Sequence, residues 1–118
     1  MILLVDDHID NLKYMQALAE QAGYPSVLAS DADEAIQYLE TNIPDLIVLD
    51  LVLPGIGGLE LVEQLRQQPQ FDPVPIMAVT AAMEVYTRAD AIAAGCQAYL
   101  AKPFSNDDWI EIVRHLLS

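Results

Sequence analysis

The feature that most constrains the fold is an alternation between short apolar runs and longer amphipathic segments. Three runs, "ILLV" (2–5), "LIVL" (46–49) and "PIMAVT" (75–80), have the length of a β-strand and are apolar at nearly every position. Such near-continuous apolarity is typical of strands that are covered on both faces. "PSVLA" (25–29) and "AYLA" (98–101) are weaker strand candidates.

Between these runs, apolar residues recur at the three- and four-residue spacing of amphipathic helices. The helical positions are Leu12, Met15, Leu18, Ala19 and Ala22; Ala32, Ala35, Ile36 and Leu39; Leu61, Val62 and Leu65; Ala89, Ile92, Ala93 and Cys96; and Ile110, Val113 and Leu117. Five strands that alternate with five helices predict an α/β fold with right-handed crossovers, in which a parallel sheet carries helices on both faces.

Local signals predict where several helices begin and end. The Ser-x-x-Asp segments at 30–33 and 105–108 have the spacing of a capping box, although Asp replaces the usual Glu. Gly23 and Gly95 stand where two helical patterns stop, as glycines commonly do.

Length and composition exclude several functional classes. With 118 residues the chain fits one domain, and we expect a single domain without an output domain. Eighteen acidic residues against five Lys and Arg give a formal charge of −13, so we expect neither direct nucleic-acid binding nor attraction to anionic membranes. Cys96 is the one cysteine, and the N-terminus does not resemble a signal peptide, so we expect a reducing cytoplasm.

Polar residues follow four of the predicted strands. The first strand runs into Asp6 and Asp7, the third into Asp50, the fourth into Thr80 and the fifth into Lys102. Each residue alone is explained as well by a turn, a cap or a solvated side chain. Because ligands of open parallel sheets bind beyond the carboxyl ends of the strands, their joint placement favours one shared site.

The chemistry of this set predicts phosphoryl transfer. Three carboxylates held close together repel one another unless a divalent cation neutralises them. Oxygen ligands without a His or Cys cluster favour Mg²⁺ over Zn²⁺, and a Mg²⁺ ion that keeps several waters has room for a phosphoryl oxygen. Asp50 is then a candidate nucleophile at phosphorus, with Lys102 and Thr80 to stabilise phosphoryl oxygens.

The motifs "LLVDD", "LIVLDLVLPGIGGLEL", "VTA" and "AYLAKPF", in this order, resemble the receiver domain of bacterial response regulators. The resemblance spans residues 1–118 and implies a CheY-type, flavodoxin-like (βα)5 fold with a doubly wound parallel sheet in the order 2-1-3-4-5. It also implies a phosphorylatable signalling switch, whose only reactions are its own phosphorylation and dephosphorylation, rather than an enzyme.

The same resemblance implies a role for each site residue. Asp50 would be the phosphorylated residue; Asp7, Asp50 and the backbone carbonyl of Val52 would bind Mg²⁺ (or Mn²⁺) directly, and Asp6 would act mainly through water. The remaining roles fall to Thr80 and Lys102 as the phosphoryl-binding hydroxyl and ammonium, Tyr99 as the switch aromatic, and Pro103 as a cis-proline.

The resemblance further implies how the switch works. A histidine kinase or a histidine phosphotransfer protein donates the phosphoryl group from phosphohistidine to Asp50. Thr80 then moves toward the phosphate, and Tyr99 turns inward into the vacated space. The surface of the fourth helix, fifth strand and fifth helix changes shape and is recognised by a protein effector, which the sequence does not identify.

Four positions suggest properties particular to this chain. Val52 and Ala82 lie two residues after Asp50 and Thr80 and carry no polar side chain, so we expect slow hydrolysis of the acyl phosphate. The last helix has apolar residues on more of its circumference than one sheet contact needs; this predicts either a wide core face or a homodimer or partner patch around Trp109. His8 is expected at the rim of the site, without a catalytic role.

Other functions compete on the same residues. A haloacid-dehalogenase-type phosphatase also uses an Asp nucleophile and Mg²⁺, yet it needs a second Asp where this chain has Val52. A flavodoxin-type FMN module needs a phosphate-cradling loop where this chain has "DDHID". A receiver that only docks remains open, and so does the choice between a stand-alone regulator and a domain cut from a larger protein.

Overall fold

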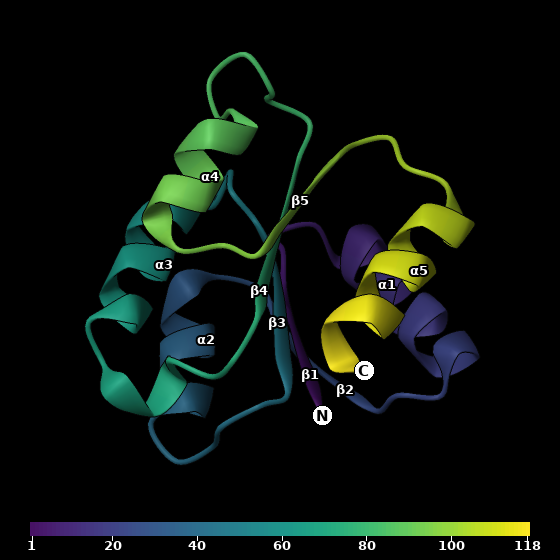
Figure 1. Cartoon of the computed structure of the whole chain (residues 1–118), viewed down its shortest axis with the longest axis horizontal. Helices are drawn as coiled ribbons and strands as arrows, with labels where there is room; N and C mark the ends of the chain where they lie inside the picture. Colours follow the sequence, from purple (N-terminus) through teal and green to yellow (C-terminus); the bar gives the residue numbers. More distant parts are fainter.

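A five-stranded parallel sheet lies between two layers of helices (Figure 1). The computed structural model describes all residues from 1 to 118. The strands are β1 (Ile2–Val5), β2 (Ser26–Ala29), β3 (Leu46–Asp50), β4 (Ile76–Thr80) and β5 (Ala98–Ala101). The helices are α1 (Ile9–Ala22), α2 (Ala32–Leu39), α3 (Gly58–Arg66), α4 (Arg88–Ala94) and α5 (Asn106–Leu117), with a 3₁₀ turn, η1, at Pro69–Phe71.

The strand order is β2-β1-β3-β4-β5, and every pair is parallel, which confirms the predicted fold and topology. Helices α2, α3 and α4 cover one face of the sheet, and α1 and α5 cover the other (Figure 1). The strand order reverses at β1, which has β2 on one side and β3 on the other. A crevice is expected at such a point, beyond the carboxyl ends of β1 and β3.

The sheet has a separate hydrophobic core on each face, because successive side chains of a strand point to opposite sides. Leu3 and Val5 of β1 belong to the core under α2, α3 and α4, whereas Ile2 and Leu4 belong to the core under α1 and α5. All four β1 side chains are fully buried. The near-continuous apolar runs of the sequence are therefore confirmed as strands covered on both faces.

Trp109 of α5 lies in the second core and is fully buried. The prediction of a surface patch built around Trp109 is therefore wrong, and the alternative of a wide core face is confirmed for this residue. The sequence could not separate the two because α5 packs against both the sheet and α1, which widens its buried face. Ile112, Leu116 and Leu117 are the α5 apolar residues that remain partly exposed.

The helix caps agree with the sequence at three of four predicted ends. Ser105 caps α5 by accepting a hydrogen bond from the Asp108 N–H, and Gly23 and Gly95 end α1 and α4 with positive φ angles of 94° and 122°. At α2 the cap is Asp31, whose carboxylate accepts from Glu34 N–H, rather than the expected Ser30. The Ser30 hydroxyl instead donates to the Glu34 carboxylate, since the acid one residue later is the better acceptor for the helix N–H.

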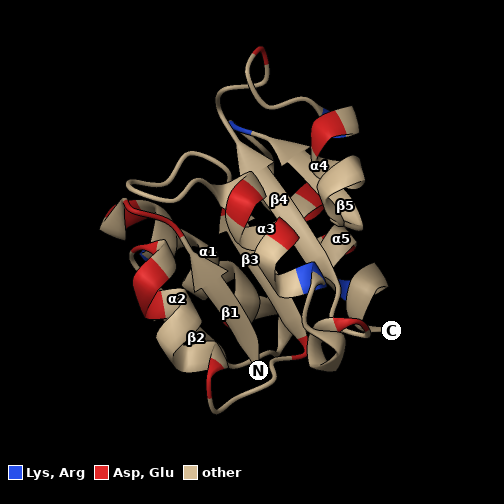
Figure 2. Cartoon of the chain, turned by 90° about the vertical axis from the view of Figure 1, so that its left-hand side faces the viewer, with Lys and Arg blue, Asp and Glu red and all other residues tan.

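Acidic side chains are spread over the helices and connecting segments, and basic ones are few (Figure 2). No helix of the chain has both the length and the apolar character needed to cross a lipid bilayer.

Candidate phosphoacceptor site

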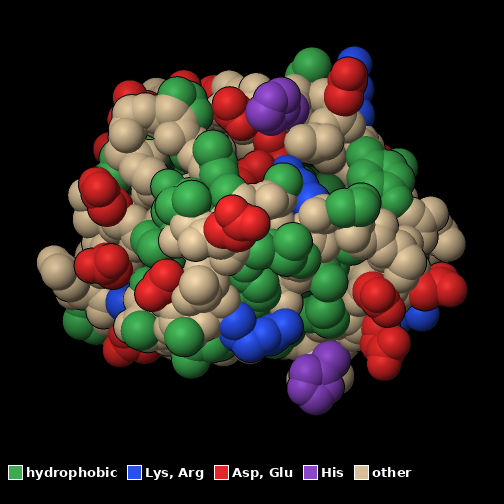
Figure 3. Space-filling model, turned by 90° about the horizontal axis from the view of Figure 1, so that it is seen from above, with side chains coloured by type: hydrophobic (Ala, Val, Ile, Leu, Met, Phe, Trp, Pro, Cys, Tyr) green, Lys and Arg blue, Asp and Glu red, His purple; other side chains and the backbone are tan.

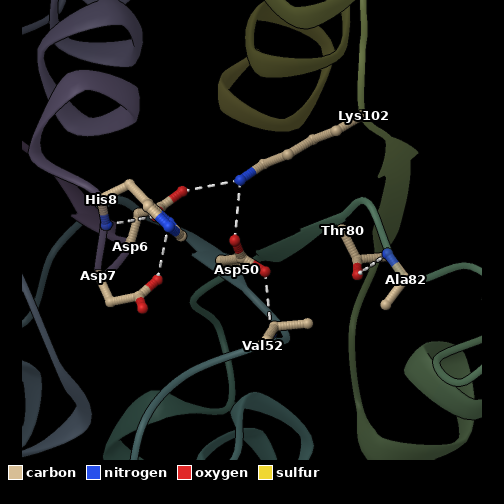
Figure 4. Close-up of polar contacts among 8 residues, drawn as sticks. All are labelled: Asp6, Asp7, His8, Asp50, Val52, Thr80, Ala82 and Lys102. Atoms are coloured by element: carbon tan, nitrogen blue, oxygen red, sulfur yellow. Dashed lines mark hydrogen bonds and ion pairs between the residues drawn. The ribbon is translucent and has the colours of Figure 1, made fainter.

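Asp50 is the last residue of β3, and only 5% of it is exposed. The backbone N–H of Val52 donates to Asp50 Oδ1 at 2.8 Å, and Lys102 Nζ donates to Oδ2 at 2.8 Å (Figure 4). The carboxylate is therefore held at both oxygens. Such an arrangement suits a nucleophile, because the orientation of the Asp50 carboxylate is fixed before a substrate arrives.

Close backbone packing beneath Asp50 fixes the start of α3. A Cβ atom at Gly58 would lie 2.6 Å from Leu51 Cα and 2.7 Å from the Asp50 carbonyl oxygen, closer than a side chain tolerates. Gly55 adopts a φ of +72°, a conformation that suits glycine. The "LPGIGG" segment thus turns the chain sharply and brings α3 against the end of β3.

Lys102 follows β5 and links the acids at the ends of β1 and β3, which are neighbours in the sheet. Its ammonium lies 2.8 Å from Asp6 Oδ2 as well as 2.8 Å from Asp50 Oδ2. Burial lowers the pKa of Lys102, but the hydrogen bonds that its ammonium donates to Asp50 and Asp6 outweigh burial and hold the pKa above the ordinary value. The cation therefore stays charged at neutral pH. The Lys102–Pro103 peptide bond is cis, as predicted.

The acidic pair lies at the end of β1, with two different environments. Asp6 is fully buried and bonded to Lys102, whereas the Asp7 side chain is 33% exposed. His8 follows the pair, and its imidazole Nδ1 lies 3.1 Å from Asp7 Oδ1 (Figure 4). Asp6 is thus occupied within the protein, and Asp7 is the acid more open to a ligand.

A cavity of about 380 Å³ opens over Asp50. Its lining residues come from the ends of β1, β3, β4 and β5 and from the first turn of α1: His8, Asn11, Asp50, Val52, Ala81, Ala82 and Lys102. Seen from above in Figure 3, acidic, basic and histidine side chains gather around a hollow that hydrophobic side chains border. The predicted convergence of strand ends is present, although Thr80 itself does not line the cavity.

Thr80 is fully buried, and its hydroxyl oxygen accepts a hydrogen bond from the Ala82 N–H at 2.9 Å (Figure 4). This bond ties the hydroxyl to the segment that follows β4. The hydroxyl proton makes no hydrogen bond to Asp50 or Lys102. Thr80 thus ends β4 beside the cavity without lining it.

Tyr99 of β5 already points inward. Its ring is 8% exposed, its hydroxyl donates to the Tyr86 carbonyl at 2.6 Å, and the Arg88 guanidinium lies 5.3 Å from the ring centroid. The expectation that Tyr99 turns inward only after Thr80 moves does not describe this structure. Tyr86 and Arg88 hold the ring from the start of α4, a pairing that the sequence analysis missed because the partners lie 11 to 13 positions away.

The donor set fits a divalent cation that prefers oxygen. Asp7 and Asp50 present carboxylate oxygens at the ends of adjacent strands, and the Val52 carbonyl oxygen accepts no hydrogen bond from the protein. Asp6, Asp7 and His8 also have ligand atoms within 4.8 Å of one another. Carboxylate and carbonyl oxygens are the ligands that Mg²⁺ and Mn²⁺ take in proteins.

Comparison with known protein families identifies the family of this chain. The model of the response regulator receiver domain matches residues 2–114. The chain is a member of the receiver domain family. Receiver domains are phosphorylatable switches rather than typical enzymes, and as a class they accept phosphoryl groups from histidine kinases.

Individual receiver proteins agree with this assignment. The chain is 41% identical over 104 residues to the alkaline phosphatase synthesis transcriptional regulatory protein PhoP of Bacillus subtilis, covering 88% of this chain and 42% of PhoP. It is 36% identical over 118 residues to the response regulator Rre1 of Synechocystis, covering 99% of this chain and 51% of Rre1. The chain thus spans about half the length of these relatives.

A solved receiver domain adds a metal ion to the comparison. The receiver domain of the sensor histidine kinase PA1611 from Pseudomonas aeruginosa superposes with a TM-score of 0.89 at 32% identity. The match covers 98% of this chain and 95% of that receiver domain, which holds a magnesium ion coordinated in its active-site cleft.

Proposed function

We propose that this receiver domain, residues 1–118, accepts a phosphoryl group on Asp50 from the phosphohistidine of a histidine kinase or a histidine phosphotransfer protein. The observation that carries the proposal is the Asp50 carboxylate, fixed by Val52 N–H and Lys102 at the floor of an open cavity. The reaction depends on Mg²⁺ or Mn²⁺, for which Asp7, Asp50 and the Val52 carbonyl would be the direct ligands, with Asp6 acting through water. The bound ion supplies charge neutralisation.

The residues of the site have separate tasks in the transfer. An oxygen of Asp50 attacks phosphorus, the phosphorus–nitrogen bond of the donor breaks, and the electron pair leaves with the imidazole nitrogen of the donor. Lys102 already lies within hydrogen-bond distance of Asp50, so it balances charge as the phosphoryl group arrives. The Thr80 hydroxyl donates a hydrogen bond to a phosphoryl oxygen while its oxygen keeps the hydrogen bond from the Ala82 N–H.

The retained bond between Thr80 and Ala82 connects the site to a distant surface. When Thr80 moves, the segment after β4 moves with it, and this segment contains the Tyr86 carbonyl that binds the Tyr99 hydroxyl. The phosphoryl group carries close to two negative charges in place of the single charge of the Asp50 carboxylate, so the conformation that offers it the better hydrogen bond and ion pair gains population. The face formed by α4, β5 and α5 then changes and is recognised by a protein effector.

The α4-β5-α5 face is also where we place a possible homodimer contact. A groove of about 620 Å³ runs along β5 between α4 and α5. Ile112 and Leu116 line it, together with Arg88, Asp108 and Glu111, so that apolar and oppositely charged side chains share one surface. A protein partner or a second copy of the chain fits this chemistry better than nucleic acid or a membrane, given the net charge of −13.

Intact-mass analysis after incubation with acetyl phosphate and Mg²⁺ tests the proposal. The parent protein should gain the mass of one phosphoryl group, and Asp50→Asn should gain none. Asp33→Asn, which removes an exposed carboxylate of α2, is the matched control and should be labelled like the parent. Chelation of the metal should stop labelling in every variant.

Other outcomes separate the competing functions. Labelling of Asp50→Asn, or no labelling of the parent, would reject Asp50 as the acceptor and leave a docking module. Continuous turnover of small phosphate esters without accumulation of the labelled protein would indicate a phosphatase.

Two of the three apolar residues that line the cavity, Val52 and Ala82, predict a long-lived phosphorylated state. Val52 is 45% exposed at the cavity wall and Ala82 lies across from it, so neither side chain can orient the attacking water. One hydrogen bond of about 1 kcal/mol in the transition state accelerates hydrolysis about fivefold. Val52→Asn and Ala82→Glu together should therefore speed loss of the label, measured by the decay of intact mass after removal of the donor; Ala17→Glu, at an exposed position of α1 outside the cavity, is the control.

A further inference from the structure

His8 is a polar side chain of the phosphoacceptor cavity that the proposed phosphoryl transfer does not use. It stands at the N-cap position of α1, yet its side chain makes no capping hydrogen bond. Its backbone N–H donates to Asp6 Oδ1 at 2.9 Å. This bond turns the chain so that the imidazole folds back over the acidic pair, with Nδ1 3.1 Å from Asp7 Oδ1 and 3.4 Å from Asp6 Oδ1 (Figure 4).

The imidazole and the phosphoacceptor face the same space. His8 and Asn11 are the uncharged polar residues among those that line the cavity over Asp50. The side chain of His8 is 69% exposed, so nothing covers it from outside. A ligand that enters the cavity therefore meets the imidazole together with Asp50, and the Asp7 carboxylate lies 3.1 Å from the imidazole Nδ1.

The distance between the His8 ring nitrogen and the Asp7 carboxylate suits two ligands of one metal ion. Two neighbouring ligands at about 2.1 Å from an octahedral ion lie about 3 Å apart. His8 Nδ1 and Asp7 Oδ1 are 3.1 Å apart. Asp6, Asp7 and His8 together place ligand atoms within 4.8 Å of one another. The pair can thus bind one ion in adjacent positions with little rearrangement.

We propose that His8 is a nitrogen ligand of the divalent ion in the phosphoacceptor pocket and that it shifts the metal preference of the pocket from Mg²⁺ toward transition metals. Mg²⁺ is a hard ion that takes oxygen ligands, whereas imidazole binds the later first-row ions well, in the order Mn²⁺ below Co²⁺ below Ni²⁺. The inference rests on the proposed function, because it adds His8 to the ligands Asp7 and Asp50 of the same ion.

Isothermal titration of the untagged full chain with Ni²⁺ and with Mg²⁺ tests the inference, at about pH 8, where free imidazole is neutral. Even outer-shell partners of a metal ligand contribute about 10- to 100-fold to affinity, so His8→Gln should weaken Ni²⁺ binding at least about tenfold. Mg²⁺ binding should stay close to that of the parent. His115→Gln, which removes the other histidine of the chain from α5, is the matched control and should change neither affinity.

The visible absorption of bound Ni²⁺ gives a readout that does not depend on phosphorylation. Replacing a nitrogen ligand with oxygen weakens the ligand field, so the bands of the His8→Gln complex should move to longer wavelength. A spectrum and a Ni²⁺ affinity unchanged in His8→Gln would overturn the inference.

Asp7→Asn separates this inference from the proposed function. If Asp7→Asn abolishes binding of both metals while His8→Gln changes neither, the pocket binds metal without His8, and only the inference fails. If Asp7→Asn leaves both affinities unchanged, the proposed metal site fails and the inference fails with it. Loss of Ni²⁺ binding in both variants, with Mg²⁺ lost only in Asp7→Asn, is the result expected.

Discussion

The two ends of the sheet differ in the partners of their partly buried basic side chains. At the carboxyl end, Lys102 lies between the carboxylates of Asp6 and Asp50, and Asp7 adds a third acid beside them. At the amino end of β4 and β5, the Arg66 guanidinium forms no ion pair with a carboxylate and donates only to neutral oxygens. One end gathers excess negative charge, and the other satisfies a single positive charge with carbonyl groups.

Arg66 joins segments that are far apart in the sequence. It extends from the end of α3 and donates to the carbonyl oxygens of Phe71, Val74 and Gly95 and to Gln97 Oε1, at 2.6 to 3.0 Å. Gln97 Oε1 also accepts from the N–H of Ile76, at the first residue of β4. Burial lowers the pKa of Arg66 below its usual value, and nearby Cys96 and Asp72 only partly offset this. This end therefore stabilises the fold, whereas the other end is organised to receive an ion and a phosphoryl group.

The comparison predicts that Arg66→Met has the largest effect on stability. The substitution leaves buried carbonyl oxygens without a donor, and hydrogen bonds to charged groups are worth about 1.5–3 kcal/mol each, with strong non-additivity. We expect a loss of about 3 kcal/mol in the free energy of unfolding, measured by urea denaturation. Arg66→Lys keeps the charge but not the planar fork and should lose an intermediate amount; equal stability of all three proteins would contradict the comparison.

Gly58 at the carboxyl end of the sheet and Gly95 at the amino end provide a matched pair of substitutions. In Gly58→Ala the new Cβ meets backbone atoms of Leu51 and Asp50, which cannot yield. Overpacking of this kind costs about 1–3 kcal/mol, and it should also slow labelling by acetyl phosphate because Asp50 is displaced. In Gly95→Ala the new Cβ meets the Arg66 stem and the φ of +122° is strained, so stability should fall while labelling stays normal. Normal labelling of Gly58→Ala would show that Asp50 does not depend on this contact.

Cys96, which lies near Arg66 at the amino end of the sheet, predicts a pH dependence of the free energy of unfolding. Burial raises the pKa of the Cys96 thiol from 9.0 to about 11, which nearby Arg66 only partly offsets. The unfolded chain therefore loses this proton first as pH rises, so the contribution to stability is complete below about 9 and is lost between about 9 and 11. The loss should be about 2 kcal/mol in the parent and absent in Cys96→Ala, measured by urea denaturation across this range; parallel profiles would refute it.

Asp7→Asn should have the smallest effect and the opposite sign. It removes one of three neighbouring carboxylates without breaking the Lys102 bridge, so repulsion among the acids falls. Because the Asp7 side chain is 33% exposed, the gain should be about 0.5–1 kcal/mol at low ionic strength and less in high salt. A loss of stability in metal-free buffer would show that the acidic end is not strained by its charge.

Most of the fold and the principal site residues could be predicted from the sequence. Apolar periodicity is local, so the five strands and five helices were readable without knowledge of their neighbours. Asp6, Asp7, Asp50 and Lys102 were found because polar residues at the ends of parallel strands must meet at one edge of the sheet. The resemblance to receiver domains added the strand order and the cis Lys102–Pro103 bond.

The tertiary structure decided those features whose partners lie far away in the sequence. The burial of Trp109, the four acceptors of Arg66 and the inward position of Tyr99 depend on helices that approach from other parts of the chain. The direction of the His8 ring depends on a hydrogen bond to Asp6 that replaces helix capping. Local pattern determined which residues form each element, whereas side-chain orientation followed from packing, because the competing orientations differ only in contacts that the folded chain supplies.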